Sequence, residues 1–306
     1  MKAPIHSYAD NLYLIELTPP LAGFSRFIGA WAYKGPSTVL VDVGPAATVP
    51  LLRQALQKIG ITHLDYILLT HIHLDHAGGV GALSLHFPDT PIVVHANGLA
   101  HLMAPERLWA GSLTTLGETA KAYGPLTAVP APLLMAADRF KSPAITPLET
   151  LGHSPHHVSY LTPDYLFAGE AGGVCIQLPD GRSWMRPATP ATFFLDKALS
   201  SLNALIALNP DTICYGHFGL QPDAAQYLVR HRAQLLFWER VIELEAKCGP
   251  TENLVTRCLD RLLSEDPELV GYDQLPEAER EREVFFLTNS IKGFLSWCLK
   301  DSDPLR

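Results

Sequence analysis

The sequence predicts a layered fold of the α+β class, followed by a C-terminal helical region. Two observations carry this prediction. Through the first two thirds of the chain, short apolar runs of strand-like composition alternate with segments of helical periodicity, and this alternation is typical of sheets covered by helices. From Pro222 onward the composition shifts to helix-forming residues. We therefore expect a layered domain over residues 1–221 and a helical region over residues 222–306.

The N-terminal part of the chain alternates strands with helices. Runs rich in β-branched and aromatic residues, separated by turn residues, predict strands over residues 12–17, 27–33, 38–41, 66–69 and 92–95. Apolar residues at helical spacing predict helices over residues 50–59 and 79–86. Residues 96–125 have little strand character and predict a helical insertion or lid.

The middle of the chain continues the pattern. Strands are predicted over residues 145–149 and 165–168, and a helix over residues 196–208. Arg186 lies among aromatic residues between these segments. It could hold a carboxylate of a substrate, but we favour a surface salt bridge for it.

The tail predicts three helices, over residues 224–247, 253–263 and 277–300, with Gly249-Pro250 ending the first. Their charged faces are interpreted as solvated, whereas their apolar stripes need a partner surface. Two arrangements stay open, a cap over the active site and a homodimer surface, because periodicity does not distinguish between them.

Size, charge and cysteine spacing limit the classes of function. The net charge of −8 over 306 residues argues against nucleic acid as a partner, because nucleic-acid-binding proteins usually present a basic face. No run of 18 or more apolar residues is present, so we expect no membrane span. The chain also lacks a recognisable secretory signal, and its five cysteines have no C-x-x-C spacing. Both features favour a cytoplasmic protein with reduced thiols.

The segment after the predicted strand at residues 66–69 is rich in metal-binding residue types. His71, His73, Asp75 and His76 lie within six residues, and two glycines follow. Imidazole and carboxylate groups bind zinc and related divalent ions. Alternate residues of an extended segment share a face, so His71 and His73 can converge on one ion, while Asp75 and His76 can face a second. The odds that composition alone produces this pattern are on the order of one in a thousand, so we interpret the segment as a metal site.

The HIHLDH run after an apolar strand resembles the signature of the metallo-β-lactamase superfamily of metallohydrolases. Four other segments resemble the remaining family motifs in the family's order, namely VDVGP at residues 41–45, LGHSPHHVSY at 151–160, GEAGG at 169–173 and YGHFG at 215–219. The resemblance covers the chain from Asp42 to Gly219. It implies an αββα four-layer sandwich, in which two packed mixed sheets lie between helices and the metal ions lie at one edge.

The resemblance also implies two divalent metal ions as cofactors, with zinc as the expected metal and iron or manganese as alternatives. Carried over residue by residue, the ligands of one ion would be His71, His73 and His153, those of the other Asp75, His76 and His217, with Glu170 between the two ions.

Glu170 departs from the family, which usually has aspartate at this position. One extra methylene changes the reach of the carboxylate, which leaves open whether both ions bind at the usual spacing. Asp42 is implied to support the site from behind, although a turn-forming aspartate before glycine is an equally good explanation. His157 is expected behind the ligands. His156 stands where the family more often has glycine, and we give it no metal role.

The activity that the resemblance implies is hydrolysis by a metal-bound hydroxide. Two ions about 3.5–4 Å apart can share a hydroxide near neutral pH, and Asp75 would orient it or pass a proton to the leaving group. The expected substrate is a small ester, thioester, lactone or related molecule. Two alternatives stay open. One is a redox enzyme of the same fold, such as an iron-dependent persulfide dioxygenase or a diiron oxygen-reducing enzyme, and the other is a non-catalytic metal-binding protein.

Overall fold

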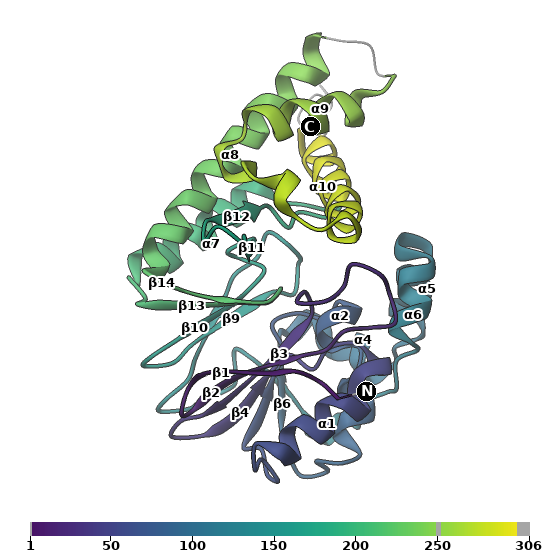
Figure 1. Ribbon diagram of the computed structural model, residues 1–306. Helices are drawn as coiled ribbons and strands as arrows, with labels where there is room; N and C mark the ends of the chain where they lie inside the picture. Colours follow the sequence, from purple (N-terminus) through teal and green to yellow (C-terminus); the bar gives the residue numbers. More distant parts are fainter. Residues whose placement is uncertain (1, 249–251, 299–306) are drawn as a thin grey trace.

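Two β-sheets pack face to face in the computed structural model (Figure 1), which describes residues 2–248 and 252–298. The first sheet contains, in spatial order, β1 (Ile5–Ala9), β2 (Leu12–Glu16), β3 (Gly29–Lys34), β4 (Thr38–Val41), β5 (Tyr66–Leu68), β6 (Ile92–Val94) and β7 (Leu134–Ala136). The second contains β14 (Leu220–Pro222), β13 (Thr212–Tyr215), β10 (Leu166–Gly169), β9 (Val158–Leu161) and β8 (Thr146–Glu149). Both sheets combine parallel and antiparallel pairs.

Side chains alternate across each sheet and build three apolar layers. In β4, Val39 and Val41 lie between the sheets, whereas Leu40 faces the helices outside. In β10, Phe167 lies between the sheets and Ala168 faces outward. This period of two follows from strand geometry. The result is an αββα sandwich, which confirms the predicted fold class.

Helices cover the outer face of each sheet (Figure 1). On the first sheet these are α1 (Val49–Lys58), α2 (Leu74–Ala77), α3 (Val80–Ser84), α4 (Leu99–Met103), α5 (Glu106–Leu116) and α6 (Glu118–Tyr123). On the second they are α7 (Leu195–Ala207) and α8 (Ala224–Cys248), and α9 (Leu254–Glu265) and α10 (Glu277–Cys298) pack against α8. The helical insertion expected over residues 96–125 is confirmed as α4, α5 and α6.

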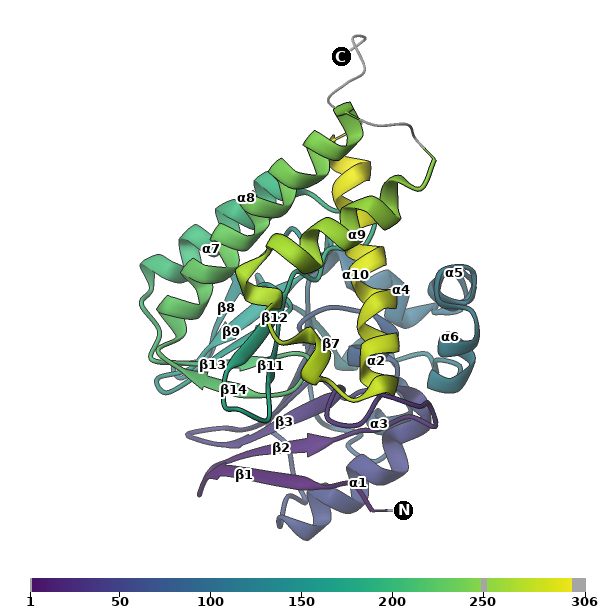
Figure 2. The same cartoon turned by 45° about the horizontal axis from the view of Figure 1, so that its top comes forward.

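The C-terminal helices share the core of the second sheet. Trp238 of α8 and Phe294 of α10 belong to the same buried cluster as Leu166 of β10. Figure 2 shows α8, α9 and α10 together at the end of the molecule opposite β1 and α1. The predicted helix over residues 277–300 ends at Cys298; its last two residues, and the expected stop at Gly249-Pro250, lie outside the described residues.

The sequence patterns did not predict β1, β7, β9, β14 or the hairpin formed by β11 (Val174–Gln177) and β12 (Ser183–Arg186). β1 and β7 are edge strands, so one side of each has no neighbouring strand and the apolar alternation is weak. In β1, for example, no side chain is fully buried. No helix within residues 2–248 and 252–298 combines the length and apolar character needed to cross a membrane.

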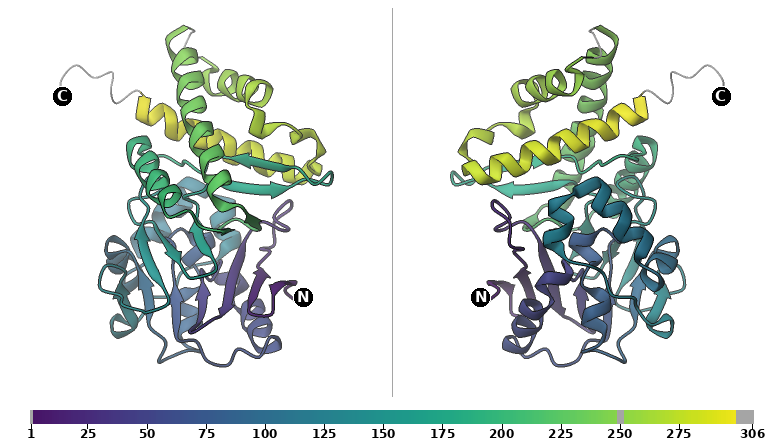
Figure 3. Two further views of the ribbon diagram at one scale, coloured as in Figure 1. Left: turned by 90° about the vertical axis from the view of Figure 1, so that its left-hand side faces the viewer. Right: turned by 90° about the vertical axis from the view of Figure 1, so that its right-hand side faces the viewer.

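Arg186 forms a buried ion pair, so the surface salt bridge that we favoured from the sequence is wrong. Its Nε donates a hydrogen bond to Glu283 of α10, and both side chains are almost fully buried. The Nε and Nη2 atoms of Arg282 lie 2.8 and 2.7 Å from the other oxygen of the same carboxylate. Figure 3 shows α10 running beside the hairpin, and Glu283 of this helix reaches Arg186 at the end of β12.

A Glu283→Gln variant is expected to lose about 3 kcal/mol of unfolding free energy at pH 7, because two buried arginine charges lose their counter-ion. Burial alone would raise the pKa of Glu283, but Arg186 and Arg282 hold it below its ordinary value of 4.5. The ionised carboxylate therefore contributes its full share of the unfolding free energy above pH 4.5. This share is lost as the pH falls through the pKa that Glu283 has in the folded protein, which lies below 4.5. Chemical denaturation of both proteins at several pH values measures this difference.

The exposed Glu281 on the same helix provides the control. Glu281→Gln should change the unfolding free energy by less than about 0.5 kcal/mol. A Glu283→Gln loss that stayed constant into acid would contradict the assignment of the stabilisation to the charged carboxylate.

Candidate metal centre

Seven histidine and acidic side chains from separate segments meet at one edge of the sandwich. β4 and β5 are parallel in the first sheet, and β10 and β13 are parallel in the second. Their carboxyl ends therefore lie at the same edge, where loops carry functional groups. The side chains brought together here are the seven named from the sequence, His71, His73, Asp75, His76, His153, Glu170 and His217.

The seven residues form two groups, each of which could hold a metal ion. His71, His73, His153 and Glu170 make the first group. Within it, His73 Nδ1 lies 3.0 Å from both His71 Nε2 and His153 Nε2. The second group contains Asp75, His76 and His217. In both groups the candidate ligand atoms lie within 4.8 Å of one another.

Glu170 lies between the two groups despite its extra methylene. Its Oε2 is 2.9 Å from His153 Nε2 and 3.3 Å from His71 Nε2 in the first group. Its Oε1 is 3.1 Å from His217 Nε2 in the second. Burial alone would raise the pKa of Glu170, but His153 and His217 hold it well below its usual range. The side chain therefore presents an ionised carboxylate to both groups.

Hydrogen bonds behind the rings assign the protons of three histidines. The Thr70 hydroxyl donates to Asp42 at 2.8 Å, so it accepts from His71 Nδ1, 3.0 Å away. His76 Nδ1 lies 2.9 Å from an Asp42 oxygen and donates to it. His153 Nδ1 donates to the Ala188 carbonyl oxygen at 2.7 Å. In each neutral ring the Nε2 atom then carries a lone pair directed into the site.

When the rings are neutral, these lone pairs face carboxylate oxygens, and such a contact is favourable only with a positive charge between the two atoms, supplied by a proton or by a metal ion. In the neutral tautomer of His153, its Nε2 and Glu170 Oε2 are both acceptors, and they are only 2.9 Å apart. The buried His76 Nε2 has no hydrogen-bond partner among the described residues and lies 3.6 Å from Glu170 and 3.9 Å from Asp75. Burial disfavours a charged ring there, yet Asp75 and Asp42 raise the pKa of His76 to about 9. The donor set therefore fits divalent metal ions.

Asp42 supports the site from behind, so its position agrees with the first of the two roles considered for it. Its carboxylate accepts from the Thr70 backbone N–H at 2.8 Å and from His76 Nδ1 at 2.9 Å. We expect Asp42→Asn to weaken zinc binding by about 10–100-fold, because groups behind metal ligands fix their orientation and basicity. Competition with a chromophoric chelator measures the affinity. Asp138→Asn, at an exposed position, should bind zinc as the wild type does; equal affinities for Asp42→Asn would contradict the role.

His157 holds the segment that carries Glu170. Its Nε2 accepts from the Glu170 backbone N–H at 3.0 Å, and its Nδ1 lies 2.8 Å from the Thr150 hydroxyl. The neighbouring Gly169 has φ 56°, and a Cβ atom there would lie 2.5 Å from His157 Nε2. Only glycine fits this close approach. His156 belongs to neither group and contacts the Ser154 hydroxyl through Nδ1 at 3.1 Å.

Sequence reasoning missed Thr70 and Ala188 as hydrogen-bond partners of the candidate ligands. Thr70 directly precedes His71 at the end of a strand, and a hydroxyl in that position is a usable signal. Ala188 acts through its backbone carbonyl, so its side chain gives no signal. The same holds for any residue that contributes only main-chain atoms.

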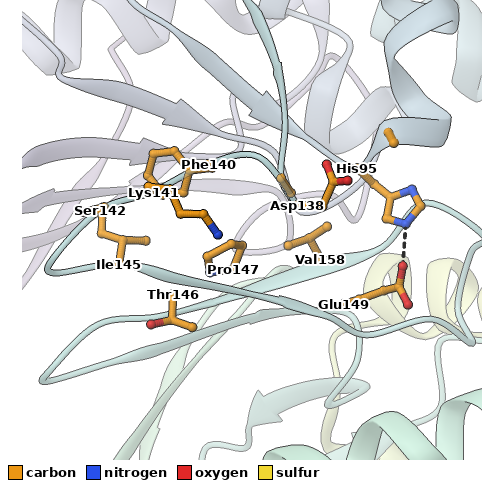
Figure 4. Close-up of a pocket in the computed structure, with 12 residues that line it drawn as sticks. His95, Asp138, Phe140, Lys141, Ser142, Ile145, Thr146, Pro147, Glu149 and Val158 are labelled. Carbon is orange, nitrogen blue, oxygen red and sulfur yellow. Dashed lines mark hydrogen bonds and ion pairs between the residues drawn. The ribbon is translucent and has the colours of Figure 1, made fainter.

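A cleft of about 540 Å³ lies beside the loop that carries His153 (Figure 4). At one end, His95 Nε2 lies 3.0 Å from Glu149, as the dashed line in Figure 4 shows. The adjacent Asn97 donates to the Pro155 carbonyl at 2.9 Å. The twelve residues that line the cleft include none of the seven candidate ligands, so the cleft is separate from the metal centre.

Comparison with known proteins identifies the family whose sequence pattern this chain shares. The profile of the Metallo-beta-lactamase superfamily matches residues 32–217, more than half of the chain. A metallo-beta-lactamase fold-containing protein of Sulfurisphaera tokodaii is 28% identical over 218 residues, which is 67% of this chain and 76% of that protein. A hydroxyacylglutathione hydrolase of Xanthomonas campestris is 30% identical over 232 residues, which is 72% of this chain and 74% of that protein. A hydroxyacylglutathione hydrolase of Hamiltonella defensa is 27% identical over 278 residues, which is 85% of this chain and 94% of that protein.

Solved structures share the fold. An archaeal metallo-beta-lactamase superfamily protein from Sulfolobus tokodaii superposes with a TM-score of 0.68 at 20% identity, covering 93% of this chain and 98% of its own. A metallo-beta-lactamase family protein from Thermus thermophilus superposes with a TM-score of 0.66 at 19% identity, covering 97% and 95%. Coverage this high includes most of the C-terminal helical region.

Proposed function

The chain belongs to the metallo-β-lactamase superfamily and is a hydrolase of that fold; we propose that its substrates are small acyl thioesters. The observation that carries this proposal is the similarity to hydroxyacylglutathione hydrolases over 72% and 85% of the chain. Their name specifies removal of a hydroxyacyl group from glutathione, whose acyl derivatives are thioesters. The net charge of −8 supports a small molecule over a nucleic acid.

We infer two divalent ions, with zinc as the expected metal. One would be held by His71, His73 and His153, the other by Asp75, His76 and His217, with Glu170 between them. The reach of the Glu170 carboxylate to both groups supports this inference. When bound, such ions supply a Lewis acid for the acyl carbonyl and lower the pKa of water to near neutrality.

Asp75 is the residue we propose for proton transfer. Its Oδ2 lies 3.7 Å from His217 Nε2, and its side chain is more exposed than that of His217, 12% against 3%. It can therefore face both the second group and an approaching substrate. As water forms the new C–O bond and the C–S bond breaks, Asp75 accepts a hydrogen bond from the water, and the released proton ends on the departing sulfur.

A substrate panel tests the proposal with the purified, metal-analysed protein. The panel contains a hydroxyacyl thioester of glutathione, a simple acyl thioester, the matched oxygen ester, a lactone and a β-lactam. We expect the thioesters to be cleaved at least about tenfold faster than the oxygen ester in kcat/KM. Chelation should remove this activity, and added zinc should restore it.

Two results would overturn the substrate proposal. Preferential cleavage of the lactone or β-lactam would place the enzyme in another substrate class of the same fold. Oxygen consumption by iron-loaded protein with a glutathione persulfide, together with intact thioesters, would favour the redox alternative.

A further inference from the structure

His217 is held differently from three of the other candidate histidine ligands. His71, His76 and His153 each have Nδ1 fixed by a hydrogen bond to a neighbouring group. The Nδ1 atom of His217 is buried and has no hydrogen-bond partner among the described residues. Instead, the His217 ring stacks on the Phe27 ring, with centroids 4.1 Å apart and planes 11° apart. An aromatic face, not a hydrogen bond, therefore sets the orientation of this ring.

Phe27 is in turn held by the C-terminal helix. The fully buried Phe27 lies just before β3, and Phe286 of α10 packs beside it with ring centroids 5.2 Å apart. The Arg282 guanidinium of α10 lies 4.1 Å from the Phe27 ring centroid. A cation over a desolvated aromatic ring is attracted by the ring's negative face. Phe286 and Arg282 of α10 therefore contact Phe27, and Phe27 contacts His217, so the contact from α10 to His217 is continuous.

Arg282 is fixed on this ring by its other contacts. Its Nε donates to Glu283 at 2.8 Å, and its Nη1 donates to the Gly23 carbonyl oxygen. Gly23 allows a close approach of its loop to α10, because a Cβ atom there would lie 2.1 Å from the Ala278 carbonyl oxygen. The loop that carries Phe27 is thus bound to α10 through both its backbone and its aromatic side chain.

We propose that Phe27 and Arg282 are positioning residues for His217, through which the C-terminal helical region controls the affinity of the ion shared with Asp75 and His76. The inference rests on the metal centre of the proposed function. It needs no particular substrate, because it concerns binding of the metal alone. It gives α10 a role different from the two that the sequence left open for the C-terminal helices, a cap over the active site and a homodimer surface.

Zinc titration of the purified protein against a competing chelator tests the inference. Phe27→Leu keeps an apolar side chain but removes the flat ring, and Arg282→Met keeps the stem but removes the charge. We expect Phe27→Leu to weaken the second zinc equivalent by about 10–100-fold, as for loss of other groups that orient ligands, with the first equivalent unchanged. Arg282→Met should shift the same equivalent by a smaller factor. Arg282→Lys, which restores the charge, should recover part of that loss.

Two matched variants separate positioning from general packing. Phe140→Leu removes another buried ring, one that packs against Tyr66 between the sheets. Arg230→Met removes an arginine that lies 4.9 Å from the Tyr227 ring centroid and pairs with Glu268. Both should bind two zinc ions with wild-type affinity. Cobalt absorption spectra of all variants report ligand geometry independently, and only the Phe27 and Arg282 variants should change them.

The outcomes are distinct from those of the substrate panel. Wild-type protein that binds two zinc ions but leaves thioesters intact rejects the substrate proposal alone. Unchanged zinc affinity in Arg282→Met and Phe27→Leu, or equal weakening of both equivalents, overturns the positioning role. If Phe27→Leu does not fold, the Arg282 series alone decides. A wild type that binds fewer than two ions overturns the inference together with the two-ion centre.

Discussion

Replacing His71 with alanine is expected to lower kcat/KM by roughly 10³-fold or more and to remove most of the bound metal. A metal ion contributes several kcal/mol to such a transition state, and each 1.36 kcal/mol is a factor of ten. His71 is fully buried, its Nε2 lies 3.0 Å from His73 Nδ1, and its Nδ1 is fixed by Thr70. Its loss therefore removes one nitrogen ligand from the buried side of the first group. His73→Ala should have the same effect.

Elemental analysis of metal per chain and steady-state kinetics on the best thioester check this prediction. Circular dichroism should show the secondary structure retained, because the sheets are held by the three apolar layers and not by the site. The exposed His86 supplies the matched control, and His86→Ala should keep wild-type metal content and turnover. Full metal content with wild-type turnover in either site variant would show that the assignment is wrong.

Replacing Glu170 with alanine is expected to remove one ion before the other and to slow turnover by at least about 100-fold. The carboxylate places one oxygen 2.9 Å from His153 and the other 3.1 Å from His217. In the proposed two-ion centre it would therefore supply negative charge between two cations that otherwise repel each other. The ion held by Asp75, His76 and His217 should be lost first, because the other ion keeps three histidine ligands. Metal content should fall from about two ions per chain to about one.

Glu170→Asp tests whether the backbone has adjusted to the longer side chain. It restores the residue that is usual in the family but withdraws the carboxylate by one methylene, so we expect metal content and rate between those of the wild type and Glu170→Ala. The exposed Glu149, converted to alanine, should leave the metal content unchanged. Unchanged stoichiometry in Glu170→Ala would mean that Glu170 is not a ligand and that this site differs from the family more deeply.

About half of the strands among the described residues were predicted from local patterns, and several of the exceptions have physical reasons. β4 was predicted with its observed bounds, Thr38–Val41, because a strand buried on both faces gives an unbroken apolar run. β1 was missed because it lies at the edge of its sheet with exposed polar side chains. Arg186 was placed on the surface because nothing in its local sequence indicates the helix that covers it.

The sequence by itself determined the chemistry of the site, because four of the seven candidate ligands are close together along the chain. His71, His73, Asp75 and His76 lie within six residues, and a strand followed by a turn is enough to direct them to neighbouring positions. The family resemblance then implied His153, Glu170 and His217, and the fold brings all seven together.

Only the tertiary structure decided what holds these residues. The carboxylate of Glu283 reaches Arg186 across 97 positions of the chain, and Arg282 lies over Phe27, which stacks on His217. These contacts depend on which face of α10 packs against the hairpin and the loop before β3. Helical periodicity shows that a helix has an apolar face, but it does not show which distant surface that face will cover. Long-range packing, and not local spacing, therefore links the C-terminal helices to the candidate metal centre.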